Sequence, residues 1–150
     1  LGVSYALLDF GKAYPQKLKN TIVIETGGMK GKRKEMLKEE LHKRLEDYFG
    51  LKNIHSEYGM TELLSQAYSK KNGIFHTPKW MNILIRDIND PLSILDFNKS
   101  GGVNIIDLAN LNSCSFIATD DLGIKLNENE FKINGRLSNS DIRGCNLLIQ

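Results

Sequence analysis

The segment Ser56-Glu57-Tyr58-Gly59-Met60-Thr61-Glu62-Leu63 sets the expected fold and holds the densest group of candidate binding residues in the chain. It follows a short apolar run typical of a strand, and it opens into a helix-compatible segment. Tyr58 offers an aromatic face for stacking, and Gly59 lets a ligand approach the backbone closely. Thr61 supplies a hydroxyl for a phosphate, and Glu62 a hard oxygen for Mg²⁺. The combination suits a nucleotide; the alternative is a polar loop whose Thr and Glu only begin a helix.

A glycine turn lies one helix upstream of this segment. Residues 21–25 form a β-branched run that predicts a buried strand, and Thr26-Gly27-Gly28 follows it directly. A helix is predicted over residues 33–49, because apolar side chains recur there at helical spacing, and Gly50 is a natural stop. A shorter helix or irregular piece is expected near the N-terminus, ending before Pro15.

A second predicted strand, residues 53–56, completes the order strand, glycine turn, helix, strand, which is one βαβ unit. Parallel strands place the loops that follow them at the same carboxyl edge of the sheet. We therefore expect Gly27 and Gly28 to lie beside the Tyr58 turn.

The pattern changes after residue 72. Short apolar runs separated by turn signals predict strands, without intervening helices, at residues 73–76, 81–86, 103–107, 115–118 and 131–133. We therefore predict a mixed α/β chain: a βαβ portion over residues 1–72, followed by a small, mainly-β, distorted barrel-like subdomain over residues 73–150.

Two further candidate sites lie in the second half. Thr119-Asp120-Asp121-Leu122-Gly123 is expected at the end of a strand, where its carboxylates could accept hydrogen bonds from sugar hydroxyls. Arg136 follows a glycine and could reach a ribose or phosphate, and Cys145 lies near the end of the sequence. The alternatives are a polar turn, a surface arginine and a small packed cysteine.

Composition narrows the class of protein. Of 150 residues, 41% are hydrophobic and 25% charged, which is ordinary for a globular domain, and a net charge of +2 is too small to indicate a nucleic-acid surface. Two cysteines make no disulfide framework and favour a reducing compartment such as the cytoplasm. We find no apolar run long enough to span a bilayer and expect no secretory leader; the start at Leu1 suggests a processed product or an excised piece.

Together the motifs resemble those of adenylate-forming enzymes, which activate carboxylic acids with ATP and include acyl-CoA ligases and peptide-synthetase adenylation domains. Residues 58–62 match the superfamily's Tyr-Gly-x-Thr-Glu motif, and Thr26-Gly27-Gly28 matches the glycine turn of its adenine pocket. Residues 119–123 resemble its Thr-Gly-Asp-Leu-Gly ribose motif, but Asp120 replaces the usual Gly, so Asp121 is the better ribose ligand. Gly135-Arg136 matches the Gly-Arg that precedes the superfamily's hinge, which implies that Arg136 also lies near the ribose.

Within the superfamily, residues 100–110 and 135–146 are most similar to the acyl-protein synthetase branch, whose best-known member is the LuxE component of the bacterial bioluminescence fatty-acid reductase. In that branch the acyl group passes from the adenylate to a cysteine near the carboxyl terminus, and then to an acyl-CoA-reductase-like partner. Cys145 occupies such a position, and Arg136 and Arg143 could favour its thiolate.

The resemblance implies ATP and Mg²⁺ as cofactors and a fatty or other apolar carboxylic acid as substrate, with Glu62 holding the metal and Thr61 the phosphate. The superfamily's phosphate loop and its C-terminal domain with a catalytic lysine are not in this sequence. We therefore expect a piece of a longer enzyme, with little or no turnover alone. Two alternatives stay open: a phenylacetate-type acyl-CoA ligase, and a non-catalytic nucleotide-binding domain of the same fold.

Overall fold

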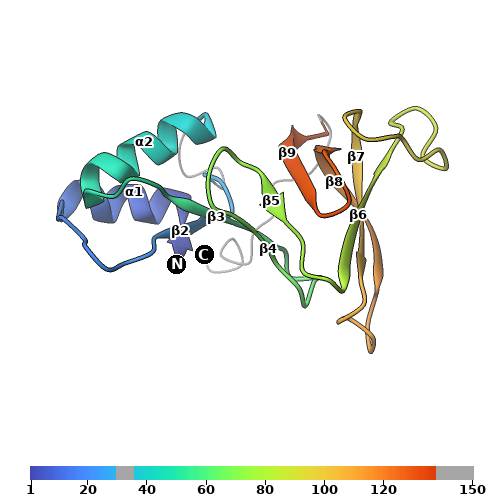
Figure 1. The fold of residues 1–150 in the computed structure, drawn as a ribbon, viewed down its shortest axis with the longest axis horizontal. Coiled ribbons are helices and arrows are strands. Elements are labelled where there is room, and N and C mark those ends of the chain that lie inside the picture. Colours follow the sequence, from blue (N-terminus) through green and yellow to red (C-terminus); the bar gives the residue numbers. More distant parts are fainter. Residues whose placement is uncertain (30–35, 138–150) are drawn as a thin grey trace, which may run out of the picture. The chain divides into compact units, whose positions relative to one another are not determined.

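The computed structural model describes residues 1–29 and 36–137, which divide into two compact units. The first unit comprises Leu1–Tyr58 and Ser69–Gly73, and the second comprises Gly59–Tyr68 and residues 74–137. In chain order the elements (Figure 1) are β1 (Gly2–Val3), α1 (Ser4–Ala13), β2 (Ile24–Thr26), α2 (Lys38–Phe49), β3 (His55–Tyr58), β4 (Ala67–Ser69), β5 (Phe75–His76), β6 (Met81–Arg86), β7 (Ser100–Asp107), β8 (Phe116–Lys125) and β9 (Glu130–Arg136).

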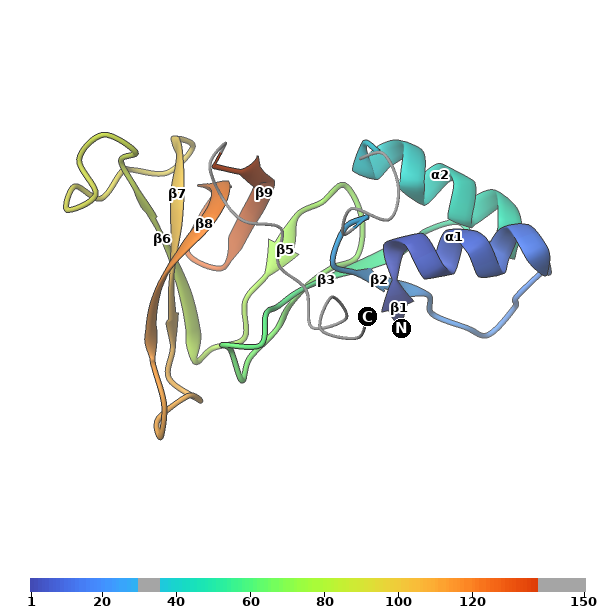
Figure 2. The ribbon, with the colours of Figure 1, turned by 180° about the vertical axis from the view of Figure 1, so that it is seen from behind.

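The first unit is built from two successive βαβ crossovers. β1 pairs in parallel with β2, and β2 pairs in parallel with β3. Both crossovers step in the same direction along the sheet, so right-handed connections place α1 and α2 on one side of the strands, as Figures 1 and 2 show. The sequence predicted the second of these crossovers; the first was missed because the two-residue β1 is too short to show a strand pattern.

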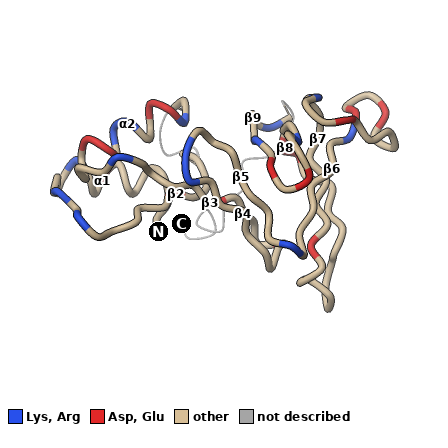
Figure 3. The backbone as a smooth tube through the Cα atoms, viewed as in Figure 1, with Lys and Arg blue, Asp and Glu red and all other residues tan. Residues whose placement is uncertain are grey.

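The helices of this unit close over one apolar core. Its buried members come from α1, α2, the strand-flanking segments and the glycine turn: Leu8, Val23, Met29, Leu41, Leu45, Phe49 and Ile54. The apolar spacing therefore predicted the buried positions Leu41 and Leu45 of α2, but Leu37, which shares that spacing, is exposed. Basic and acidic residues follow one another in short groups along α2, as Figure 3 shows.

The predicted start of the long helix was wrong. α2 begins at Lys38 rather than Arg33, and Leu37 is its N-cap residue, with extended backbone angles (φ −60°, ψ 138°) and a side chain that is 76% exposed. The carbonyl of Leu37 accepts the first helical hydrogen bond, from the Leu41 amide at 3.0 Å. Apolar periodicity cannot distinguish an N-cap from the first helical turn, because an apolar N-cap residue can have the same spacing as the apolar residues inside the helix. The predicted end is confirmed: Gly50 caps the helix in the left-handed conformation.

The second unit is an open antiparallel sheet in the order β5-β9-β8-β7-β6. Alternate side chains of β6 are buried, as the period of a half-buried strand requires, and Phe75 stacks on its cross-strand partner Phe131 with ring centroids 5.5 Å apart. The strands predicted in this half are present: β6 has the predicted bounds, and the other four have shifted ends. The mixed α/β class, with a βαβ portion followed by a mainly-β portion, is thereby confirmed.

Among the described residues no helix has the length and apolarity needed to cross a membrane, since α1 has 10 residues and α2 has 12.

Candidate functional site

In the first unit the glycine turn and the end of β3 lie side by side. Thr26, the last residue of β2, is the register partner of Glu57, which precedes Tyr58. Gly27 then adopts φ 58°, a left-handed conformation that a residue with a Cβ takes only under strain. The turn therefore leaves the sheet at its carboxyl edge next to Tyr58, which is the adjacency that the βαβ order predicts.

A buried polar cluster around Glu25 lies directly before the glycine turn. The carboxylate of Glu25, 3% exposed, accepts a hydrogen bond from Ser4 Oγ at 2.8 Å and pairs with Lys38 Nζ at 2.9 Å. His42 Nε2 lies 3.3 Å from the same carboxylate and 3.2 Å from Ser56 Oγ. Glu25 immediately precedes Thr26, so the cluster ties β2 to both helices and to β3 at the base of the glycine turn.

The charge of Glu25 is strongly stabilised within this cluster. Burial by itself would raise the pKa of the carboxyl group, but the His42 hydrogen bond, the Lys38 charge and the Ser56 hydroxyl outweigh burial and lower the pKa to about 2. Sequence reasoning missed the cluster, because Glu25 occupies an apolar run and its partners are 13 to 31 positions away along the chain. The one available signal was a lone carboxylate inside a run predicted to be buried, which requires a partner.

In the second unit Thr61 and Glu62 occupy the centre of a turn rather than the start of a helix. The Leu63 amide donates to the Met60 carbonyl at 3.1 Å, which closes the turn, and both central side chains are exposed. The chain then enters β4 instead of a helix, so the expectation of a helix after this motif was wrong. The backbone after the turn is held by a buried carboxylate, since Asp107 on β7 accepts the Leu64 and Ser65 amides, each at 2.9 Å.

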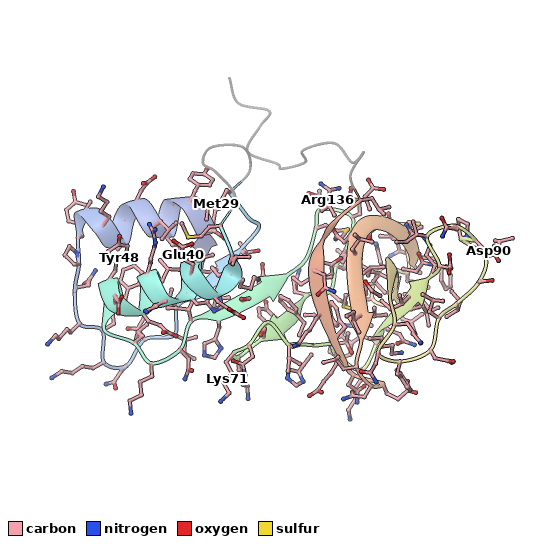
Figure 4. The ribbon with its side chains drawn as sticks, turned by 90° about the horizontal axis from the view of Figure 1, so that it is seen from above. Met29, Glu40, Tyr48, Lys71, Asp90 and Arg136 are labelled. Atoms are coloured by element: carbon pink, nitrogen blue, oxygen red, sulfur yellow. The ribbon has the colours of Figure 1, made fainter. Side chains whose placement is uncertain are left out.

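The pair Asp120-Asp121 lies inside β8, not after its end as predicted. Its cross-strand partner is β9, where Arg136 is opposite Asp121, and a register shift occurs nearby. Arg136 Nε lies 3.4 Å from Asp121 Oδ1, and Arg136 Nη2 lies 3.6 Å from Asp120 Oδ2. Gly135, with φ 143°, takes a backbone conformation that other residues rarely adopt just before this arginine, which Figure 4 labels at the end of β9. The structure thus brings together three predicted ribose-site residues.

Thr119, which precedes this pair, is fixed to the neighbouring strands. Its hydroxyl donates to the Val103 carbonyl at 2.8 Å and accepts the Asp121 amide at 3.1 Å. Arg86 on β6 reaches across β7 to donate to the Thr119 carbonyl at 2.7 Å. The first residue of the motif is therefore a structural anchor, and the two carboxylates after it are the partly exposed groups.

The exposed turn offers one carboxylate, Glu62, that could take part in binding a magnesium ion. Among the described residues no three His, Cys, Asp or Glu side chains gather into a ready-made metal site. Mg²⁺ in nucleotide sites is commonly held by one or two carboxylates together with phosphate oxygens and water. The exposed Glu62 on a fixed turn, beside the Thr61 hydroxyl, is a donor of that kind.

The cysteines divide between the described and undescribed parts of the chain. Cys145, the predicted acyl acceptor, lies outside the described residues. Cys114 is exposed, and its Sγ lies 3.0 Å from the Phe116 carbonyl oxygen.

Comparisons with known proteins agree on the fold. The computed structure is similar to ATP-bound MatB from Rhodopseudomonas palustris (TM-score 0.66, 15% identity, covering 90% of this chain and 30% of that one). It is also similar to O-succinylbenzoate coenzyme A synthetase (MenE) from Bacillus subtilis in complex with ATP and magnesium ion (TM-score 0.64, 19% identity, 95% and 32% covered). A benzoate CoA ligase from Burkholderia xenovorans LB400 matches with a TM-score of 0.54, 17% identity, and 90% and 30% covered.

At these identities the likeness shows the fold alone, and the chain spans about a third of the length of these structures. No curated protein matches the sequence. The family comparison does match, as acyl-protein synthetase, LuxE, over residues 3–150. The match covers nearly the whole chain and agrees with the motifs and with the adenylate-forming fold, and on that basis this chain belongs to the LuxE acyl-protein synthetase family.

Proposed function

We propose that the full-length protein activates a fatty or other apolar carboxylic acid with ATP and Mg²⁺, forming an acyl-adenylate, and passes the acyl group to a protein cysteine. An acyl-CoA-reductase-like partner would then take the acyl group from that thioester. A cytoplasmic location, where thiols stay reduced, belongs to the same proposal. The observation that carries it is the pair Thr61 and Glu62, exposed on a turn whose backbone is fixed, in a chain of this family.

The reaction needs positioning and charge neutralisation more than proton transfer. An oxygen of the carboxylate attacks the α-phosphorus of ATP, and the bond to the β-phosphate oxygen breaks, which releases pyrophosphate. The Thr61 hydroxyl would donate a hydrogen bond to a phosphate oxygen, and Glu62 would hold Mg²⁺, which supplies neutralisation of the phosphate charge when bound. MatB with ATP, and MenE with ATP and magnesium ion, are structural neighbours that support this cofactor set.

The remaining candidate residues would bind the adenosine half of ATP. Gly27 and Gly28 would let the adenine approach the backbone, and Tyr58 would offer it an aromatic face; Gly59, which lacks a side chain, would likewise leave its backbone open to the ligand. Asp121, with Asp120 and Arg136 beside it, would hold the ribose hydroxyls. These assignments follow the superfamily motifs, and the contacts within each unit support them.

Acid-dependent exchange of labelled pyrophosphate into ATP tests the proposal in the full-length protein. We expect Glu62→Gln to reduce the exchange rate by about a hundredfold or more, because a lost charge contact to the reacting phosphates costs several kcal/mol. Glu128→Gln is the matched control, since Glu128 is an exposed carboxylate (77%) on the β8–β9 turn of the same unit. Wild-type exchange in Glu62→Gln, or no acid-dependent exchange in the unmodified protein, would contradict the proposal and favour a non-catalytic nucleotide-binding domain.

A second candidate is transfer to CoA instead of protein, favoured by the CoA synthetase and CoA ligase among the structural neighbours. Labelled acid, ATP and Mg²⁺ distinguish the two acceptors. Transfer to protein gives a hydroxylamine-sensitive thioester that Cys145→Ser removes and Cys114→Ser retains. A product that forms only when CoA is added, with no labelled protein, identifies the ligase instead.

A further inference from the structure

We propose that Asp107, the last residue of β7, and Asn110, in the segment that follows it, are positioning residues that hold the Thr61–Glu62 turn in its working geometry. The proposal rests on the proposed function, because it assigns to these two side chains the placement of groups that would contact phosphate and Mg²⁺. Both residues lie in the run 100–110 that resembles the acyl-protein synthetase branch, but that resemblance assigned no role to either side chain.

The turn is short, and its two central side chains point to solvent while its end is buried. One hydrogen bond closes it, from the Leu63 amide to the Met60 carbonyl at 3.1 Å, and Leu63 is only 5% exposed. A single bond of this kind contributes about 1 kcal/mol. The backbone at the end of the turn and after it accepts and donates further side-chain hydrogen bonds, which help to set where Thr61 and Glu62 lie.

Asp107 holds that backbone with a fully buried carboxylate. Its Oδ2 accepts the Leu64 and Ser65 amides, each at 2.9 Å, and its Oδ1 accepts Ser65 Oγ at 2.6 Å and the Ala109 amide at 3.2 Å. Trp80 Nε1 donates to the same Ser65 hydroxyl at 2.9 Å, which orients the hydroxyl proton toward the carboxylate. Although burial opposes ionisation, these donors outweigh it and lower the pKa of Asp107, so its carboxylate stays charged at neutral pH. We call Asp107 and Asn110 together the clamp.

Asn110 holds the turn itself. Its side-chain amide donates to the Glu62 carbonyl at 2.7 Å and to the Cys114 carbonyl at 3.0 Å, and the side chain is buried. The Glu62 peptide is therefore tied directly to the segment after β7, and the next two amides are tied to Asp107. Asn110 and Asp107 thus fix the backbone from the Glu62 carbonyl to the Ser65 amide, directly after the proposed metal ligand Glu62.

The contacts favour positioning over simple packing. Three of the four bonds that Asp107 and Asn110 make to residues 62–65 end on main-chain atoms, and a carboxylate is a costly group to bury for packing alone. Loss of the clamp should let the turn move while the sheet persists, because β6, β7 and β8 pair with one another along their lengths. A displacement of about 1 Å at a reacting group can reduce the rate by about a hundredfold.

The test uses Asp107→Asn and Asn110→Ala in the full-length protein, with Asp87→Asn as the matched control. Asp87 also accepts two backbone amides, from Asn89 at 2.7 Å and Asp90 at 3.2 Å, but it does so on an exposed loop of the same unit. Pyrophosphate exchange is measured against Mg²⁺ concentration, and amide hydrogen exchange is followed in peptides that cover residues 59–66.

We expect both clamp variants to lower kcat by about ten- to a hundredfold and to raise the half-saturating Mg²⁺ concentration by about tenfold, with KM for the acid within about twofold of wild type. Amide exchange should rise over residues 61–66 and stay unchanged in β6, and the control should match wild type in every measurement. If Asp107→Asn does not fold, Ser65→Ala removes one clamp bond and Ser65→Thr should restore it.

Two outcomes overturn the inference alone: wild-type Mg²⁺ dependence in variants whose turn exchanges faster, or wild-type amide exchange over the turn. An unmodified protein without acid-dependent exchange overturns the proposed function instead, so the two failures are distinguishable.

Discussion

The protonation of Glu25 should set the acid sensitivity of the first unit. The pKa of this carboxyl group is lowered from 4.5 to about 2, a shift that corresponds to about 3 kcal/mol of folding free energy at neutral pH. Because the pKa is lower in the folded state than in the unfolded chain, the contribution is complete above about pH 5 and disappears as the pH falls toward 2. About 1 kcal/mol should be lost by pH 4 and about 2 kcal/mol by pH 3.

The variant Glu25→Gln keeps the shape of the side chain and removes its charge. It leaves Lys38 and His42 facing a neutral amide at a position that is 3% exposed, so solvent screening offers little compensation on the Glu25 side of these pairs. We expect the free energy of unfolding at pH 7 to fall by about 3 kcal/mol, and the difference from wild type to shrink as the pH is lowered.

Urea unfolding of the full-length protein between pH 7 and pH 4 measures this difference. Glu40→Gln is the matched control, because Glu40 pairs with Arg44 at 2.6 Å on α2 of the same unit, but both side chains are about half exposed. That exposed pair should contribute less than about 0.5 kcal/mol. Equal effects of the two variants, or a Glu25→Gln difference that does not change with pH, would refute the assignment of the buried charge.

Two further predictions concern the adenosine contacts. Gly27→Ala should lower the free energy of unfolding by about 1 kcal/mol and raise KM for ATP, whereas Gly27→Asn should cost less stability because asparagine tolerates a φ of 58° better; equal costs in thermal unfolding would argue against a conformational cause. Arg136→Met should raise KM for ATP about tenfold with little change in KM for the acid, because it removes the cation that orients Asp120 and Asp121; an unchanged KM for ATP in pyrophosphate exchange would remove Arg136 from the ribose site.

The sequence predicted best what depends on local pattern. The strand, glycine turn, helix, strand order of β2 to β3 follows from periodicity and glycine placement. The bounds of β6 were predicted correctly from a short apolar run between turn signals. Predictions failed where a local signal was ambiguous. Thr61 and Glu62 look like the first turn of a helix, yet Leu63 turns inward and the chain continues into β4.

The same kind of ambiguity explains why the strand end was misplaced at residues 119–123, which resemble the ribose motif. Thr119 to Gly123 has turn-forming residues, and polar residues of this kind usually end a strand. Here the Thr119 hydroxyl donates a hydrogen bond to the Val103 carbonyl, and Arg86 donates one to the Thr119 carbonyl. With these groups bonded, β8 runs through the motif to Lys125. Neither Arg86 nor Val103 is near the motif in sequence, and local composition could not report them.

The groups that hold the candidate site are therefore of a different kind from the groups that compose it. The candidate ligands Glu62 and Asp121 lie in short motifs, which sequence reasoning detects. Their supports are buried or half-buried polar side chains from distant parts of the chain: Ser65 and its partner Asp107 are 42 residues apart, and Arg86 and Thr119 are 33 apart. Burying a polar side chain costs free energy unless all of its hydrogen bonds are formed. Each such side chain therefore indicates that the backbone segment it bonds to is held tightly in place. If the proposed reaction proceeds by positioning charged phosphates, the buried Asp107 is as informative about it as the exposed Glu62, although only the folded chain reveals Asp107.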